Sequence, residues 1–296
     1  MKILITGATG FIGSHLTKKM LAEGYKLFII VRKSTKVDLL DKRIKIFVFD
    51  NNLNELIIFL QKEKFDGVIH LASLYLAAHK SEDVSNLVNS NILFSTLLLE
   101  ACVKSKVPWF INTGSFVQHF KNRQYSPVNL YAATKQAFED IARYYLETSK
   151  INFVTIKLFD TFGPNDTRPK IFSLWSTMAK TGEVLDMSPG EQIMDLNYVE
   201  NVADGFLRMV KLISKKNAQK LRGMSFTLSS GERMSLKKLS QVFESVSGKK
   251  LHINWGKRPY REREVMVPWE KGHNVPGWKP KIPLREAIKL TVKNTG

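Results

Sequence analysis

The chain is 296 residues long, with 44% hydrophobic and 24% charged residues, which is the balance of a folded globular protein and not of a disordered one. A single cysteine, Cys102, excludes an internal disulfide, and we find no secretory signal and no apolar run of about 20 residues, so we expect a soluble cytoplasmic protein. The formal net charge is +18, but basic residues occur as pairs such as Lys215-Lys216 and not as long runs. We therefore favour a lysine-rich surface over nucleic-acid binding; attraction of an anionic small substrate is a third interpretation.

Short β-rich segments alternate with helical patterns through the first 160 residues. The expected strands are Lys2–Thr6, Lys26–Val31, Ile44–Phe49, Gly67–Leu71, Pro108–Asn112 and Phe153–Leu158. The expected helices are Phe11–Glu23, Asn54–Gln61, Asp83–Ser105 and Leu130–Glu147. Strands that alternate with helices pair in parallel, and nearly continuous apolar strands are covered on both faces. The pattern therefore predicts an α/β fold with a Rossmann-type, doubly wound parallel sheet.

The second half is less regular from Gly163 onward. Helices are expected at Val202–Ile213, Ser235–Val246 and Leu284–Val292. We predict a dinucleotide-binding domain over residues 1–160 and a smaller α/β substrate lobe over 161–296. The boundary between them is soft and the two parts are expected to intertwine.

The segment Gly7–Gly13 (GATGFIG) follows a strand and opens a helix, which is the context that a dinucleotide-binding turn requires. The first glycine permits the tight turn, the second lets the backbone approach a pyrophosphate, and the third lets helix and strand pack closely. The alternative is a set of packing glycines without a ligand. The residues assigned to the cofactor here are Gly7, Thr9, Gly10, Phe11, Ile12 and Gly13.

The end of the second strand indicates which dinucleotide is bound. An NAD site usually carries an acidic residue there, whereas this chain has Arg32 and Lys33, which suit a 2′-phosphate. We therefore favour NADP over NAD; two merely solvated basic residues are the alternative. Asp50 and Asn51 are expected at the adenine edge. Leu71, Ala72 and Ser73, after the fourth strand, are expected beside the cofactor.

Tyr131 and Lys135 are four residues apart on a predicted helix and so share one face. An ammonium close to a phenol lowers the phenol's pKa from about 10, and we expect this to make Tyr131 an acid or base. Ser115, at the end of the fifth strand, is the expected hydroxyl partner, with Thr113 as the competing candidate. Asn91 is expected to orient a water or a backbone group beside Lys135.

These segments together resemble the extended short-chain dehydrogenase/reductase family, in its nucleotide-sugar branch of NAD-dependent epimerases and dehydratases. Further landmarks of the resemblance are Leu158–Pro164, Met194–Val202, Ser229–Gly231 and Gly277–Pro280. The resemblance implies that Ser115, Tyr131 and Lys135 form the catalytic triad. It also implies a nucleotide-diphosphate sugar as substrate, a homodimer, and no metal.

Several departures from the family pattern narrow the reaction. Asp160 stands where the family usually has Asn, and Met194 where it often has Arg, on the side that binds the nucleotide sugar. Arg258 is a candidate anchor for the diphosphate. The residues after Ser115 lack the acidic pair of the family's 4,6-dehydratases, and Cys102 is a poor match for its epimerising cysteine.

The leading hypothesis is an NADPH-dependent reductase of a CDP- or dTDP-linked 4-keto-deoxy sugar, resembling the synthases of CDP-linked 3,6-dideoxyhexoses in deoxysugar and lipopolysaccharide biosynthesis. The runner-up is a nucleotide-sugar 4-epimerase that retains NAD. A third hypothesis, suggested by the charge, is a non-catalytic NADP-binding regulator or RNA-associated protein. The complete Ser–Tyr–Lys set argues against the third, because a binding protein has no need of it.

Overall fold

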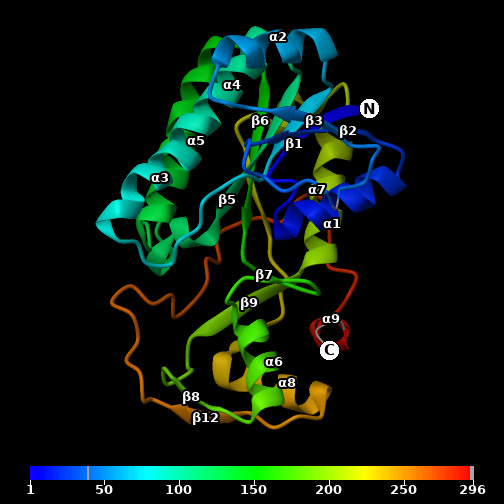
Figure 1. Ribbon diagram of the computed structural model, residues 1–296. Coiled ribbons are helices and arrows are strands. Elements are labelled where there is room, and N and C mark those ends of the chain that lie inside the picture. Colours follow the sequence, from blue (N-terminus) through cyan, green and yellow to red (C-terminus); the bar gives the residue numbers. More distant parts are fainter. Residues whose placement is uncertain (39, 294–296) are drawn as a thin grey trace.

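A seven-stranded parallel sheet forms the centre of the protein, as a computed structural model describes it for residues 1–38 and 40–293. The strands lie in the order β10-β6-β5-β4-β1-β2-β3 (Figure 1). Their bounds are β1 Lys2–Thr6, β2 Lys26–Val31, β3 Lys45–Val48, β4 Gly67–His70, β5 Trp109–Ser115, β6 Asn152–Leu158 and β10 Ser225–Leu228. The order of β1 to β6 is that of a Rossmann sheet, so the predicted fold class is confirmed.

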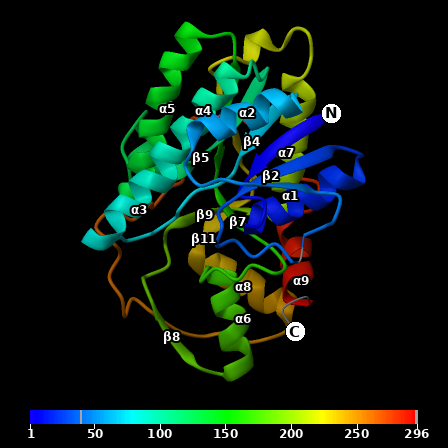
Figure 2. The ribbon, with the colours of Figure 1, turned by 45° about the horizontal axis from the view of Figure 1, so that its top comes forward.

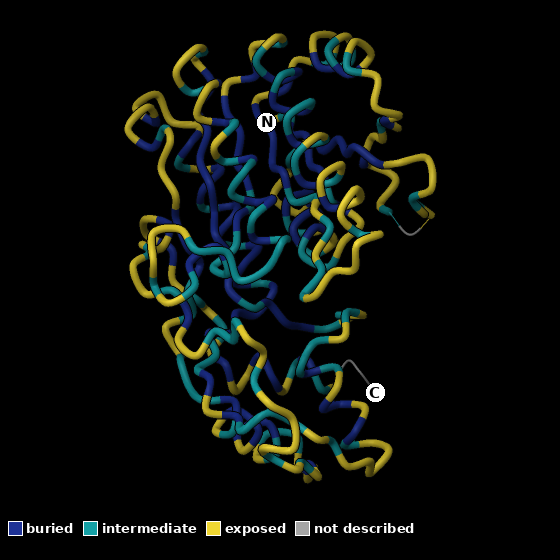
Figure 3. The backbone as a smooth tube through the Cα atoms, turned by 90° about the vertical axis from the view of Figure 1, so that its left-hand side faces the viewer, coloured by how far each residue is buried: buried dark blue, intermediate teal, exposed yellow. Residues whose placement is uncertain are grey.

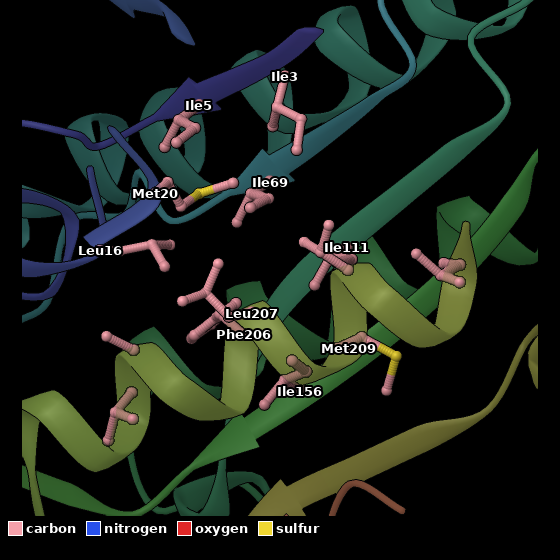
Figure 4. Close-up of a cluster of buried hydrophobic side chains, with 14 of the residues drawn as sticks. Ile3, Ile5, Leu16, Met20, Ile69, Ile111, Ile156, Phe206, Leu207 and Met209 are labelled. Atoms are coloured by element: carbon pink, nitrogen blue, oxygen red, sulfur yellow. The ribbon is translucent and has the colours of Figure 1, made fainter. Parts of the chain in front are cut away.

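Helices cover both faces of this sheet because its strands are apolar on both sides. In β1, Leu4 packs toward α2 (Leu53–Glu63), α4 (Phe94–Lys104) and α5 (Leu130–Thr148). Its neighbours Ile3 and Ile5 pack toward α1 (Phe11–Ala22) and α7 (Val199–Ile213). Figure 4 shows this second core. Leu16 and Met20 of α1 and Phe206 and Leu207 of α7 point into the same space as the isoleucines of the strands. Two separate cores thus fix the sheet between two helical layers.

The predicted helix Asp83–Ser105 is continuous but not uniform. It consists of a 3₁₀ turn at Ser81–Asp83, α3 (Val84–Val88), a π-helical turn at Asn89–Leu93 and α4. The stretch Ser81–Lys104 is long and apolar enough to cross a membrane by length and composition, contrary to our expectation that no such segment exists. Leu98 and Leu99 pack in the sheet's core and Leu87 is buried, whereas Val84, Val88 and Leu93 are exposed. Burial against the sheet therefore accounts for part of its apolar character.

A second lobe lies beyond the carboxyl ends of the sheet strands (Figures 1 and 2). Its strands are β7 Asp160–Phe162, β8 Val184–Met187, β9 Ile193–Tyr198, β11 Arg233–Ser235 and β12 His252–Trp255. Its helices are α6 Ile171–Thr181, α8 Leu236–Ser247 and α9 Leu284–Lys293. Phe172, Trp175 and Phe243 form the centre of its core. The chain returns from this lobe to the sheet in α7 and β10, so the two parts are interwoven.

Residues 256–283, here called the strap, connect β12 to α9 without a helix of their own. In Figure 1 the strap is the orange loop that runs from β12 up toward the base of β5 and α5. Trp269 stacks on His119 with ring centres 3.8 Å apart, and Arg263 donates to Ser126 at 2.9 Å. The strap therefore holds the segment that follows β5 against the second lobe. In Figure 3 much of it is exposed or only partly buried, unlike the buried strands.

Candidate active site

The glycine turn brings β1, α1 and the loop after β4 into close contact. Gly7 has a φ of +70°, and a Cβ there would lie 2.6 Å from the backbone nitrogen of Ala72. A Cβ on Gly13 would lie 2.1 Å from the carbonyl oxygen of Gly7. Gly10 is the N-cap of α1 and offers no side chain to the first amides of the helix, which stay available to an anion. The turn therefore has the shape and the free donors that fit a dinucleotide pyrophosphate.

The residues predicted to bind the adenosine half of the dinucleotide follow the strands β2 and β3. Arg32 and Lys33 follow β2 and are exposed, and within the described residues neither forms an ion pair. Asp50 is exposed and accepts a hydrogen bond from the backbone N–H of Asn52 at 3.1 Å. Asn51 has a φ of +73°, which turns the chain into α2. These groups lie at the same edge of the sheet as the glycine turn, because all its strands run in parallel.

Tyr131 meets Ser115 at the point where β5 and α5 converge. Asn129 caps α5 by accepting the backbone N–H of Ala132 at 3.0 Å, which places Tyr131 in the first turn of the helix. The hydroxyls of Ser115 and Ser73 lie close enough to the phenol of Tyr131 to lower its pKa. Thr113 does not take part: its Oγ1 is buried and has no partner among the described residues.

The pKa of Tyr131 differs from our expectation. Burial raises it to about 12, although the neighbouring hydroxyls of Ser73 and Ser115 and the charge of Arg168 act in the opposite direction. The predicted lowering by Lys135 was wrong, because the loss of solvation around a buried phenol outweighs the nearby charges. Tyr131 therefore carries its proton at neutral pH and is a proton donor in this form.

Lys135 is 2% exposed, and its burial lowers its pKa to about 8, while Glu139 one turn further along α5 acts in the opposite direction. No hydrogen bond within the described residues involves its ammonium group. A buried ammonium without a hydrogen-bond acceptor is costly. Lys135 is therefore ready to donate to hydroxyl groups of a bound ligand.

Asn91 lies in the π-helical turn and ties the loop after β4 to α5. Its side-chain oxygen accepts from the hydroxyl of Ser73 at 3.0 Å and from the backbone N–H of Leu74 at 2.8 Å. Its amide donates to Leu74 at 3.0 Å and to Thr134 at 2.9 Å. Asn91 thus positions Ser73, which in turn contacts Tyr131. Its direct partners are these groups and not Lys135.

Three residues that the sequence did not single out border Tyr131 on the side of the second lobe. The ring of Tyr75 packs edge-to-face against that of Tyr131 at 5.0 Å, and Lys170 lies over Tyr75 at 4.7 Å. Lys170 also pairs with Asp160 at 3.0 Å. Arg168 lies 4.5 Å from the ring centre of Phe11, next to the glycine turn. No spacing rule connects these residues to Tyr131, because Tyr75 comes from the loop after β4 and Arg168 and Lys170 come from the loop between β7 and α6.

The remaining substrate-side predictions lie farther from Tyr131 along the second lobe. Arg258 is exposed just after β12, and its backbone N–H donates to Met187 of β8 at 3.1 Å. Met194 lies in β9 opposite Met234 of β11. Among the described residues, no hydrogen bond or ion pair joins Arg258 or Met194 to Asp160 or Lys170.

The family landmarks of the second half converge around buried polar groups. Asp195 accepts from the hydroxyls of Ser229, at 2.5 Å, and Ser230, at 3.0 Å. The indole of Trp278 donates to the backbone oxygen of Asn201 at 3.0 Å. Segments separated by dozens of residues thus pack together in the second lobe.

The sequence profile of the NAD dependent epimerase/dehydratase family matches residues 3–221, about three quarters of the chain. The chain belongs to this family. A CDP-abequose synthase from Salmonella typhimurium is 26% identical over 98% of this chain and 97% of its own length. A UDP-glucose 4-epimerase from Pisum sativum is 25% identical over 97% of this chain and 93% of its own. Both similarities extend across the whole of the fold described above.

Solved structures share this fold. A UDP-glucose 4-epimerase from Thermotoga maritima, solved with UDP-glucose, has a TM-score of 0.85 at 21% identity and covers 100% of this chain and 98% of that one. A UDP-glucose 4-epimerase from Thermus thermophilus, solved with NAD, has a TM-score of 0.82 at 21% identity, with 99% and 98% covered. As a member of the epimerase/dehydratase family, this protein is an NAD(P)-dependent, oxidoreductase-type enzyme of nucleotide-sugar metabolism.

Proposed function

We propose that this enzyme uses NADPH to reduce the keto group of a CDP- or dTDP-linked 4-keto-deoxy sugar, in deoxysugar or polysaccharide biosynthesis. The observation that carries the proposal is the similarity to CDP-abequose synthases, three of which match at 24–26% identity over 97–99% of this chain and 96–100% of their own. Arg32 and Lys33 at the ribose end are exposed and form no ion pair with any described residue, which supports NADPH as the reductant.

The proposed division of the chain follows the two lobes. Residues 1–160 would hold the dinucleotide, through the glycine turn, Asp50, Asn51 and the loop at 71–73. Residues 161–296 would hold the nucleotide sugar, with Arg258 at the diphosphate, and Asp160, at the boundary of the two parts, would lie near the sugar. The chain is further proposed to act in the cytoplasm as a homodimer, without nucleic acid or membrane partners.

When bound, NADPH supplies a hydride from C4 of its nicotinamide ring. As the hydride bonds to the keto carbon, the carbonyl π electrons move to the oxygen, and Tyr131 protonates that oxygen to give the hydroxyl. Ser115 donates a hydrogen bond to the same oxygen and orients it toward Tyr131. Lys135 would bind the nicotinamide ribose. Tyr131 carries its proton at neutral pH, as the reduction requires.

A 4-epimerase that retains NAD is the second candidate. The similarity to UDP-glucose 4-epimerases over 97% of the chain favours it, and such an enzyme would use the same three side chains. The two reactions differ in stoichiometry, because a reductase consumes one NADPH for each product and an epimerase has no net consumption.

The deciding experiment follows NADPH absorbance with a panel of CDP- and dTDP-linked 4-keto-deoxy sugars. We expect one NADPH to be oxidised for each sugar reduced. Interconversion of two 4-hydroxy nucleotide sugars without added NADPH would replace the reductase with the epimerase. The absence of both reactions would contradict the two proposals together.

A further inference from the structure

A series of hydrogen-bonded polar side chains, most of them buried, connects the backbone of Ser115 to α5. Gln118 is fully buried, and its side-chain oxygen accepts the backbone N–H of Ser115 at 2.9 Å. Its amide nitrogen donates to Glu139 at 2.9 Å and to Gln136 at 3.0 Å. Gln118 therefore connects the end of β5 directly to α5.

Glu139, which accepts the hydrogen bond from Gln118, lies on the same helix as the proposed catalytic residues Tyr131 and Lys135. It lies one helical turn beyond Lys135 and two turns beyond Tyr131, on the same face of the helix. A hydrogen bond from Gln118 to Glu139 therefore fixes the end of β5, which carries Ser115, relative to the helix that carries Tyr131.

The position of Glu139 is itself held by a buried cation. Lys157 of β6 pairs with Glu139 at 3.3 Å, and the side chains are only 5% and 13% exposed. Lys157 also donates to the ring nitrogen of His119 at 2.9 Å. A Cβ on Gly114 would lie 2.9 Å from Lys157 and 3.0 Å from the side-chain oxygen of Gln118, so only glycine leaves room for this arrangement.

Burying this ion pair is expensive, and an apolar pair of the same volume is often as stable. Global stability alone therefore gives little reason for its presence. We propose that Gln118, held by Glu139 and Lys157, is a positioning residue that fixes Ser115 at hydrogen-bonding distance from Tyr131. This inference adds a role to the site and holds for either of the two candidate reactions.

The test exchanges the amide of Gln118 and the carboxylate of Glu139. Gln118→Met keeps the length of the side chain but removes its three hydrogen bonds, to Ser115, Gln136 and Glu139. Gln118→Glu sets two carboxylates against each other. The double variant Gln118→Glu/Glu139→Gln restores the hydrogen bonds between Ser115, position 118 and position 139, because the carboxylate at position 118 accepts from Ser115 and the amide at position 139 donates to it, although the ion pair of Glu139 with Lys157 is lost. Gln192→Met is the matched control, since Gln192 is a buried glutamine of the second lobe that donates to Ser188 at 3.2 Å.

Two readouts are needed. The first is amide hydrogen exchange at Ser115, which requires no substrate. We expect it to be at least about tenfold faster in Gln118→Met and Gln118→Glu, and to return toward the wild-type rate in the double variant. The second is steady-state kinetics, in which kcat should fall about 10–100-fold in both single variants while KM and cofactor affinity stay within about threefold. The double variant should recover most of kcat, and Gln192→Met should change neither readout.

Wild-type kcat and Ser115 exchange in Gln118→Met would overturn the inference, as would a double variant no better than Gln118→Glu. If Gln118→Met does not fold, the comparison between Gln118→Glu and the double variant decides. Failure of the proposed reaction would appear in the wild-type enzyme itself. In that case the exchange rates alone decide whether Gln118 holds Ser115.

Discussion

Tyr131 gives the most direct test of the proposed chemistry. Replacement by Phe removes the proton that the phenol would transfer but keeps the ring that packs against Tyr75. We expect Tyr131→Phe to fold, to bind the dinucleotide and to lose about 10²–10⁴-fold in kcat, the usual contribution of general acid catalysis. Tyr144→Phe, on the exposed face of the same helix, is the control and should leave kcat unchanged. Turnover of Tyr131→Phe near the wild-type rate would show that another group supplies the proton.

Arg32 is the residue proposed to select NADPH over NADH. A charge-assisted hydrogen bond to a 2′-phosphate contributes about 1.5–3 kcal/mol, so NADPH should bind more than tenfold more tightly than NADH. Arg32→Ala should remove most of that preference, and Lys26→Ala at the opposite end of β2 should not. For each comparison, fluorescence titration measures the dissociation constants of NADPH and NADH for the wild type and for the variant. Equal affinities in the wild-type enzyme would contradict the NADP proposal.

At the scale of the element, two glycines of one turn should respond differently to the same substitution. A Cβ on Gly13 would meet backbone atoms of Gly7 and Ala8 at 2.1 and 2.7 Å, and backbone atoms cannot turn aside. We expect Gly13→Ala to lower the free energy of unfolding by about 1–3 kcal/mol, measured by urea denaturation. Gly10 has a φ of −77°, and the nearest atom to its Cβ would be 3.2 Å away.

Gly10→Ala should therefore fold with a loss of at most about 1 kcal/mol, the cost of alanine at an N-cap. The added methyl group would lie at the helix end where the pyrophosphate is expected, so cofactor affinity should fall at least tenfold. A Gly13→Ala variant as stable as the wild type would contradict the packing argument. Unchanged cofactor affinity in Gly10→Ala would contradict the assigned position of the pyrophosphate.

The stability of the whole molecule should depend on pH through His119, which lies between the sheet and the strap. Burial and the charge of Lys157 lower its pKa to about 4, from about 6.5 in an unfolded chain. Between these two values the unfolded chain binds a proton at His119 that the folded chain does not. The free energy of unfolding therefore falls as the pH is lowered through this window.

His119→Gln removes this titration but keeps an acceptor for Lys157. We expect the wild type to lose about 1–2 kcal/mol more than His119→Gln between pH 7 and pH 5, measured by urea denaturation. His79→Gln, at an exposed position after β4, should behave like the wild type. Equal losses in the wild type and His119→Gln would show that His119 is not held neutral in the folded protein.

The local sequence was sufficient to predict the sheet strands β1 to β6 and the helices that alternate with them. Continuous apolar runs and helical spacing are local properties, and the glycine turn lies between two of these elements. The spacing of Tyr131 and Lys135 on α5 is local in the same way. The strands of the second lobe were not predicted as a set, because they are three to six residues long and pair with partners far away in the sequence.

Only the tertiary structure decided what surrounds these residues. The pKa of Tyr131 was expected to fall because Lys135 is near in sequence, but it rises because segments from elsewhere in the chain exclude water from the phenol. The pairing of Asp160 with Lys170 and the connection of Gln118 to Glu139 likewise depend on how loops and strand ends meet. The sequence by itself thus determined which elements form and which chemical groups they carry, since both follow from local patterns. The distances, burial and charges that control those groups arise only when distant segments pack together.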